Sequence, residues 1–125
     1  MQDDRMSELK SYEGGCHCGQ VRYAVQLDLS QPAIQCNCSI CQKTGTMLSF
    51  TPVSQFTLRS GESVLTDYQF NQNIIHHLFC SKCGVRSFAR GKNPDGSEMV
   101  AINVRCLEGV DLNTVKTFQY DGRSK

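Results

Sequence analysis

The sequence predicts a mainly β protein, a compact single domain built from small antiparallel sheets. Apolar and polar residues alternate over short stretches, clusters of turn-forming residues separate these stretches, and no long window shows helical periodicity. A chain of 125 residues also has the size of one domain with a modest core.

The first residues differ from the rest. Residues 1–11 carry charges without a clear period, and we expect them to form a flexible N-terminal arm. Residues 12–125 are predicted to form the folded domain.

Strand patterns account for most of that domain. We expect strands at residues 21–27, 47–51, 56–59, 65–70, 74–79, 85–89 and 99–104. The polar residues 71–73 lie between two of these stretches and predict a hairpin. Only residues 39–44 and 112–115 have the pattern of a helical turn or two.

Composition argues against two classes of partner and against disulfides. The 13 basic residues nearly balance the 12 acidic ones, which gives no basic surface for nucleic acid. No segment reaches the roughly 20 apolar residues that a membrane span needs, and the start of the chain lacks the apolar core of a signal peptide. We therefore expect a cytoplasmic protein, whose clustered cysteines bind metal instead of pairing as disulfides.

Seven of the eight cysteines fall into three clusters. Zinc takes four tetrahedral ligands, and closely spaced cysteines on tight turns supply several at once. Seven thiolates divide most simply into one site of four and one of three. The clusters are Cys16 with Cys18, then Cys36 with Cys38 and Cys41, then Cys80 with Cys83.

Glycines indicate which cysteines belong together. Cys18 and Cys83 are each followed by glycine, whereas Cys41 is followed by Gln42. A glycine there can adopt positive φ and turn its N–H toward the sulfur. The predicted closed, structural zinc site is therefore Cys16, Cys18, Cys80 and Cys83.

The remaining cysteines, Cys36, Cys38 and Cys41, are predicted to hold a second, catalytic zinc with one open position. An external thiol suits that position, because coordination would lower its pKa and yield a thiolate near neutral pH. Lys43 is a candidate for binding a substrate carboxylate or for offsetting the thiolate charge. Water, Lys43 or His76 could supply a proton.

Several alternatives stay open. Both sites could be structural, with Cys106 or a histidine completing the second. Thiolates also suit iron, and a redox disulfide between Cys80 and Cys83 is conceivable, although its usual βαβ context is missing. The rival to an enzyme is a non-catalytic, zinc-stapled module that binds a protein or a small thiol.

The three cysteine motifs resemble those of the glutathione-dependent formaldehyde-activating enzyme and centromere protein V domain family. The likeness runs through residues 15–23, 36–43, 79–84 and 102–107. It implies a zinc-binding β fold, with the structural and catalytic zinc held by the two cysteine sets named above. It also implies a carbon–sulfur lyase that adds glutathione to formaldehyde to give S-hydroxymethylglutathione. The expected partners are therefore a small-molecule thiol and an aldehyde.

Overall fold

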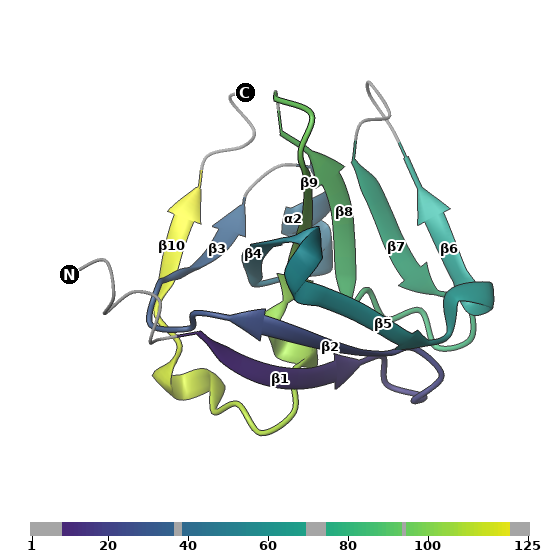
Figure 1. Ribbon diagram of the computed structural model, residues 1–125, viewed down its shortest axis with the longest axis horizontal. Coiled ribbons are helices and arrows are strands. Elements are labelled where there is room, and N and C mark those ends of the chain that lie inside the picture. The colour runs from purple at the N-terminus through teal and green to yellow at the C-terminus, as the bar shows by residue number, and fades with distance from the viewer. Residues whose placement is uncertain (1–8, 37–38, 70–74, 94, 121–125) are drawn as a thin grey trace.

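The computed structural model describes residues 9–36, 39–69, 75–93 and 95–120. Within them, ten strands form two sheets (Figure 1). The smaller sheet is antiparallel, in the order β1-β2-β5. It consists of β1 (Lys10–Gly15), β2 (Arg22–Leu27) and β5 (Phe56–Ser60).

The larger sheet has the strand order β10-β3-β4-β9-β8-β7-β6. Its strands are β3 (Ala33–Cys36), β4 (Leu48–Pro52), β6 (Leu65–Tyr68), β7 (His76–Cys80), β8 (Phe88–Lys92), β9 (Glu98–Asn103) and β10 (Thr117–Tyr120). All neighbours pair antiparallel except β10 and β3, which run parallel. In Figure 1 the strands of the small sheet run across those of the large one.

Helical structure is short in the described part of the chain. One α-helix, α2 (Ser39–Thr44), follows β3 and appears behind the large sheet in Figure 1. Single 3₁₀ turns are η1 (Val53–Gln55), η2 (Glu62–Val64), η3 (Val104–Cys106) and η4 (Leu112–Thr114).

The main core lies between the two sheets. Alternate residues of β2 point into it, and Tyr23, Val25 and Leu27 are all nearly inaccessible to solvent. Phe88, Val100 and Ile102 of the large sheet pack against this set. The period-2 pattern of the sequence therefore decides which face of each sheet is buried.

Three aromatic rings occupy the centre of this core. The rings of Tyr23, Phe56 and Phe88 lie with their centroids 4.8–5.7 Å apart, in tilted and edge-on arrangements that aromatic pairs prefer. The buried Tyr23 hydroxyl donates to the carbonyl of Ser87 at 3.3 Å, so that its polar end is paired. A Cβ at Gly14 would lie 2.8 Å from the Tyr23 ring, so this position has room only for glycine.

The opposite face of the large sheet carries a second, smaller core. Leu48, Ala89 and Ala101 form it, and Ile40 of α2 and Cys36 of β3 pack against it. The helix and the end of β3 therefore share the face turned away from the small sheet.

Most predicted elements are present, and the mainly β fold is confirmed. The strands of the expected hairpin, β6 and β7, pair antiparallel, although its turn lies outside the described residues. The strand predicted at residues 85–89 was placed too early, because β8 begins only at Phe88. The N–H of Cys80 donates to the carbonyl of Val85, so this part of the chain closes a cysteine turn instead.

Three strands were not anticipated: β1, β3 and β10. β1 begins at Lys10, within the predicted arm, and is polar with two terminal glycines. All four residues of β10 are exposed. Neither strand has an alternating pattern, and backbone pairing with β2 and β3 holds them in place.

Candidate metal centre

Four cysteines meet at one end of the core. Cys16 and Cys18 lie in the turn after β1, whereas Cys80 ends β7 and Cys83 lies in the turn that follows it. Their sulfur atoms all lie within 4.8 Å of one another. Tetrahedral zinc with sulfur at about 2.3 Å separates its ligands by about 3.8 Å. The distances of 3.5 Å from Cys16 Sγ to Cys18 Sγ and 3.7 Å from Cys18 Sγ to Cys80 Sγ fit such a cage.

The two cysteine turns share one backbone design. The N–H of Cys16 donates to the carbonyl of Val21 at 3.1 Å, and the N–H of Cys80 donates to that of Val85 at 3.0 Å. In each turn the first cysteine is therefore hydrogen-bonded to the residue five positions later. These bonds hold both turns around their sulfurs, which lowers the entropy that the chain loses when a metal binds.

Gly19 and Gly84 have the positive φ angles that the sequence predicts, 86° and 80°. Their N–H groups, however, do not bond to sulfur. Gly19 donates to the carbonyl of Cys16 at 3.3 Å and Gly84 to that of Cys80 at 2.7 Å. The glycines therefore close the turns through the backbone, and the expected bond to sulfur was wrong.

Other backbone groups do reach the sulfurs. The N–H of Val21 lies 3.3 Å from Cys16 Sγ, and the N–H of Lys82 lies 3.4 Å from Cys80 Sγ. Such donors stabilise thiolate charge and orient the lone pairs toward a metal. The donors come from tight turns, so they are fixed in direction.

The thiols of this cluster compete for protons. A backbone N–H from Val85 and one from Cys18 lower the pKa of Cys83 to about 6. Although a backbone bond from Gln20 opposes it, burial and the three neighbouring thiols raise the pKa of Cys18 to about 11. Four sulfurs this close cannot all be thiolates without a cation between them, so the donor set suits a divalent metal.

The described residues include only part of the second cysteine set. Cys36 ends β3 and is half-buried beside Ile40. Cys38 lies outside the described residues, and of Cys41 only the backbone position within α2 is described. Lys43 lies in the last turn of α2 and is exposed. Cys36 and α2 thus lie on the face of the large sheet opposite the small sheet.

The half-buried Arg86 connects α2 to the buried His77. Arg86 donates through Nη1 to Thr44 Oγ1 at 3.2 Å and lies, through Nη2, 2.7 Å from Nδ1 of His77. The pKa of His77 is lowered to about 4. Burial of the ring is the main cause, and the nearby Arg86 cation is the second. His77 is therefore neutral at physiological pH and accepts from Arg86. Sequence reasoning missed this pair, since a single arginine outside any motif gives no local signal.

The two adjacent histidines lie on opposite faces of β7. His77 faces the same side as α2, whereas Nδ1 of His76 lies 2.7 Å from Asp67 Oδ2 on the core-facing side. His76, considered above as a proton donor for the second site, is thus on the wrong face for that role. Cys106 lies apart from the four-sulfur cluster, and burial raises its pKa to about 11.

No helix in the described part of the chain is long and apolar enough to cross a membrane.

The chain resembles known proteins over most of its length. The family described as "Glutathione-dependent formaldehyde-activating enzyme" matches residues 11–119. A protein of Halomonas elongata that carries the provisional name of glutathione-dependent formaldehyde-activating enzyme is 53% identical over an alignment of 79 residues, which covers 57% of this chain and 50% of that protein. The match thus spans about half the length of this curated relative. The crystal structure of a Rhodobacter sphaeroides protein superposes with a TM-score of 0.76 at 30% identity, over 86% of this chain and 98% of that one.

Proposed function

The chain belongs to the glutathione-dependent formaldehyde-activating enzyme family, and on that premise we propose that it is a zinc-dependent carbon–sulfur lyase. In this proposal it adds a thiol, glutathione or one like it, to a small aldehyde such as formaldehyde. The match over residues 11–119 carries the proposal, because it includes all seven clustered cysteines.

We assign the two metal sites different roles. Cys16, Cys18, Cys80 and Cys83 offer a complete sulfur cage, which leaves no position for a substrate and suits a structural zinc. Cys36, Cys38 and Cys41 are proposed to hold the catalytic zinc. Three protein ligands leave one position open, and zinc there would lower the pKa of a bound thiol.

The reaction itself needs little more than positioning. The S–H bond of the thiol breaks, its sulfur forms a bond to the carbonyl carbon, and the carbonyl oxygen takes up a proton. We propose that Lys43, which is exposed in the last turn of α2, binds a carboxylate of the thiol substrate. The pair of Arg86 and Thr44 would keep α2, and with it Cys41, at a fixed position beside β3.

A small thiol and an aldehyde of this kind are cytoplasmic metabolites, and we place the protein in that compartment. This agrees with clustered cysteines that the structure gathers as a candidate metal cage instead of disulfides.

Exchange spectroscopy tests the activity. With ¹³C-formaldehyde and glutathione at equilibrium, the zinc-loaded protein should accelerate exchange between free aldehyde and its glutathione adduct. Lys43→Met should raise the glutathione concentration needed for half-maximal exchange by about tenfold, the cost of one charge-assisted hydrogen bond. Lys116→Met removes another exposed lysine and should change nothing.

The rival function, a non-catalytic module that binds a protein or a small thiol, predicts a different result. Exchange would then proceed at the uncatalysed rate, and glutathione would leave the metal coordination unchanged. A protein with two bound zinc ions that behaves in this way is not a lyase of the proposed kind.

A further inference from the structure

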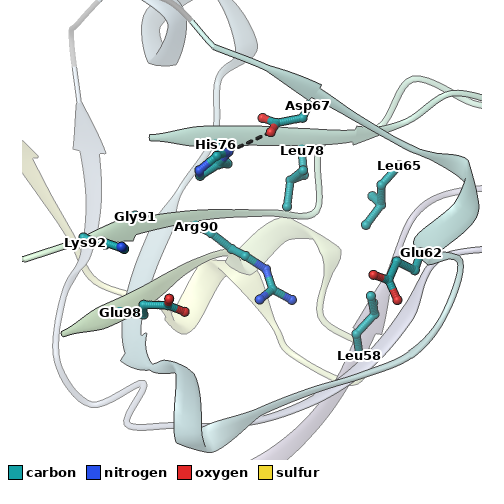
Figure 2. A pocket seen from close by; sticks show the side chains of 10 residues that line it. All are labelled: Leu58, Glu62, Leu65, Asp67, His76, Leu78, Arg90, Gly91, Lys92 and Glu98. Atoms are coloured by element: carbon teal, nitrogen blue, oxygen red, sulfur yellow. Dashed lines mark hydrogen bonds and ion pairs between the residues drawn. The ribbon is translucent and has the colours of Figure 1, made fainter. Parts of the chain in front are cut away.

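A separate cavity lies on the core-facing side of the large sheet, and no cysteine is among the residues that line it. Figure 2 shows it between Leu58 of β5 and Glu62 of η2 on one side, and Leu78 of β7 and Arg90 of β8 on the other. Its volume is about 630 Å³. That is within the range of small-molecule sites, roughly 300–1,000 Å³.

Arg90 is the prominent cation of this cavity. Its guanidinium lies 5.5 Å from the centroid of the Phe56 ring and 5.7 Å from that of Phe88, so two core aromatics hold it in place. In the described part of the chain it makes no ion pair and no hydrogen bond. Its N–H groups are therefore ready for a ligand, and their planar fork matches a carboxylate.

A histidine stands next to it. His76 is the direct partner of Arg90 across the β7–β8 pair, so the two side chains leave the sheet on the same face. Asp67 contacts Nδ1 of this histidine at 2.7 Å, which fixes the ring and leaves Nε2 for a second partner. Figure 2 shows the guanidinium of Arg90 pointing away from His76, so the carboxylate of a ligand would be held by Arg90, and His76 lines another part of the cavity.

The rest of the cavity is suited to an apolar group. Leu58, Leu65 and Leu78 line it near the tip of Arg90 (Figure 2). The charged lining comprises the cations Arg90 and Lys92 and the acidic residues Glu62, Asp67 and Glu98. The acidic side chains outnumber these two cations, which opposes a ligand with a second negative group. We propose that this cavity binds a small organic acid with one carboxylate, held by Arg90, and an apolar body against the three leucines.

This site is distinct from the proposed catalytic one. Leu78 and Phe88 belong to the core between the sheets, whereas Cys36 and Ile40 pack against the small core on the other face. The ligand is therefore neither the thiol nor the aldehyde of the proposed reaction, and the site can be tested whatever that reaction proves to be.

Calorimetric titration of the full, zinc-loaded chain with 4-methylpentanoate tests the proposal. We expect saturable binding at one site per chain, with 4-methylpentanamide and acetate both binding much more weakly. Arg90→Gln should weaken binding by about tenfold or more, since it removes a charge-assisted pair of hydrogen bonds. Arg105→Gln, which removes an exposed arginine elsewhere, should leave it unchanged.

Arg90→Lys separates a loss of binding from a loss of folding. It keeps the charge over the aromatic rings but loses the fork, so the protein should melt as the wild type does and bind the acid less tightly. The proposal is overturned if 4-methylpentanoate shows no saturation at millimolar concentrations. Equal binding of the amide, or unchanged binding by Arg90→Lys and Arg90→Gln, would overturn it as well.

Discussion

At the scale of single residues, close approach of the backbone decides which substitutions the metal turns tolerate. A Cβ at Gly15, directly before Cys16, would lie 2.0 Å from the carbonyl oxygen of Val21. At Gly19 a Cβ would meet no atom within 4 Å, although its φ of 86° is unfavourable for other residues. Glycine is therefore required at position 15 by a close backbone contact and at position 19 by the backbone conformation.

Alanine substitutions should separate the effect of the close contact at Gly15 from that of the positive φ at Gly19. Gly19→Ala is expected to cost about 1 kcal/mol, the usual penalty of the left-handed conformation. Gly15→Ala forces two backbone segments apart and should cost about 3 kcal/mol. Urea unfolding of the metal-saturated proteins measures both. Equal losses would show that the Val21 carbonyl does not restrict position 15.

His77 gives the protein a specific dependence on pH. Its pKa is about 4 in the fold, against an ordinary value of 6.5, so the unfolded chain binds the proton more readily. The associated stability is complete above pH 6.5 and is lost as pH falls toward 4, by up to about 3 kcal/mol.

His77→Asn tests this dependence. Asparagine offers Arg86 an acceptor but does not titrate, so its stability should fall less than that of the wild type between pH 6.5 and 5. Urea unfolding across this range measures the difference in stability between the two proteins. Any loss of metal at low pH affects both proteins alike and cancels from the comparison. Parallel pH profiles would mean that His77 has the same pKa in the native and the unfolded protein.

At the scale of elements, one asparagine connects the end of β9 to the segments that precede β4 and β8 and to η3. Asn103, at the end of β9, accepts from the N–H of Met47 at 3.4 Å and from that of Arg105 at 3.2 Å, and donates to the carbonyl of Arg86 at 3.0 Å. It is almost fully buried, so its bonds have no substitute in water.

Asn103→Ala should therefore lower the free energy of unfolding by roughly 2–3 kcal/mol, because it leaves buried backbone groups unpaired. The exposed Asn113 provides the matched control, and Asn113→Ala should cost less than about 0.5 kcal/mol. Denaturant unfolding compares the pair. A similar small loss for both would mean that Asn103 is not a joint between these elements.

The elements also show what sequence patterns can and cannot predict. β2, with its buried Tyr23, Val25 and Leu27, alternates clearly and was predicted to within one residue. β10 has no buried side chain at all, and only its pairing with β3 makes it a strand. Edge strands of this kind depend on distant partners, which a local pattern does not contain.

The candidate sites divide in the same way. Cysteine spacing and two glycines predicted which four sulfurs would gather, because ligand chemistry is written in local motifs. The cavity around Arg90 and the support of α2 by Arg86 depend on side chains that register brings together. Only folding places Arg90 beside His76 or Arg86 beside Thr44.

At the scale of the whole molecule, the metal cage joins the start of the domain to a distant turn. Cys18 and Cys80, whose sulfurs lie 3.7 Å apart, are separated by 62 positions. Metal at this cage links the small sheet to the large one, and such binding energy adds directly to folding energy. Metal at Cys36, Cys38 and Cys41 would connect only neighbouring segments, so the two sites should differ in their effect on stability.

Zinc content and thermal melting of two matched variants test this account most directly. The wild type should contain two zinc ions per chain. Cys38→Ser should retain one and remain folded, with exchange activity lost, whereas Cys83→Ser should melt far below the wild type or fail to fold. A wild type with one zinc, or equal destabilisation by both variants, would contradict the division into a structural and a catalytic site.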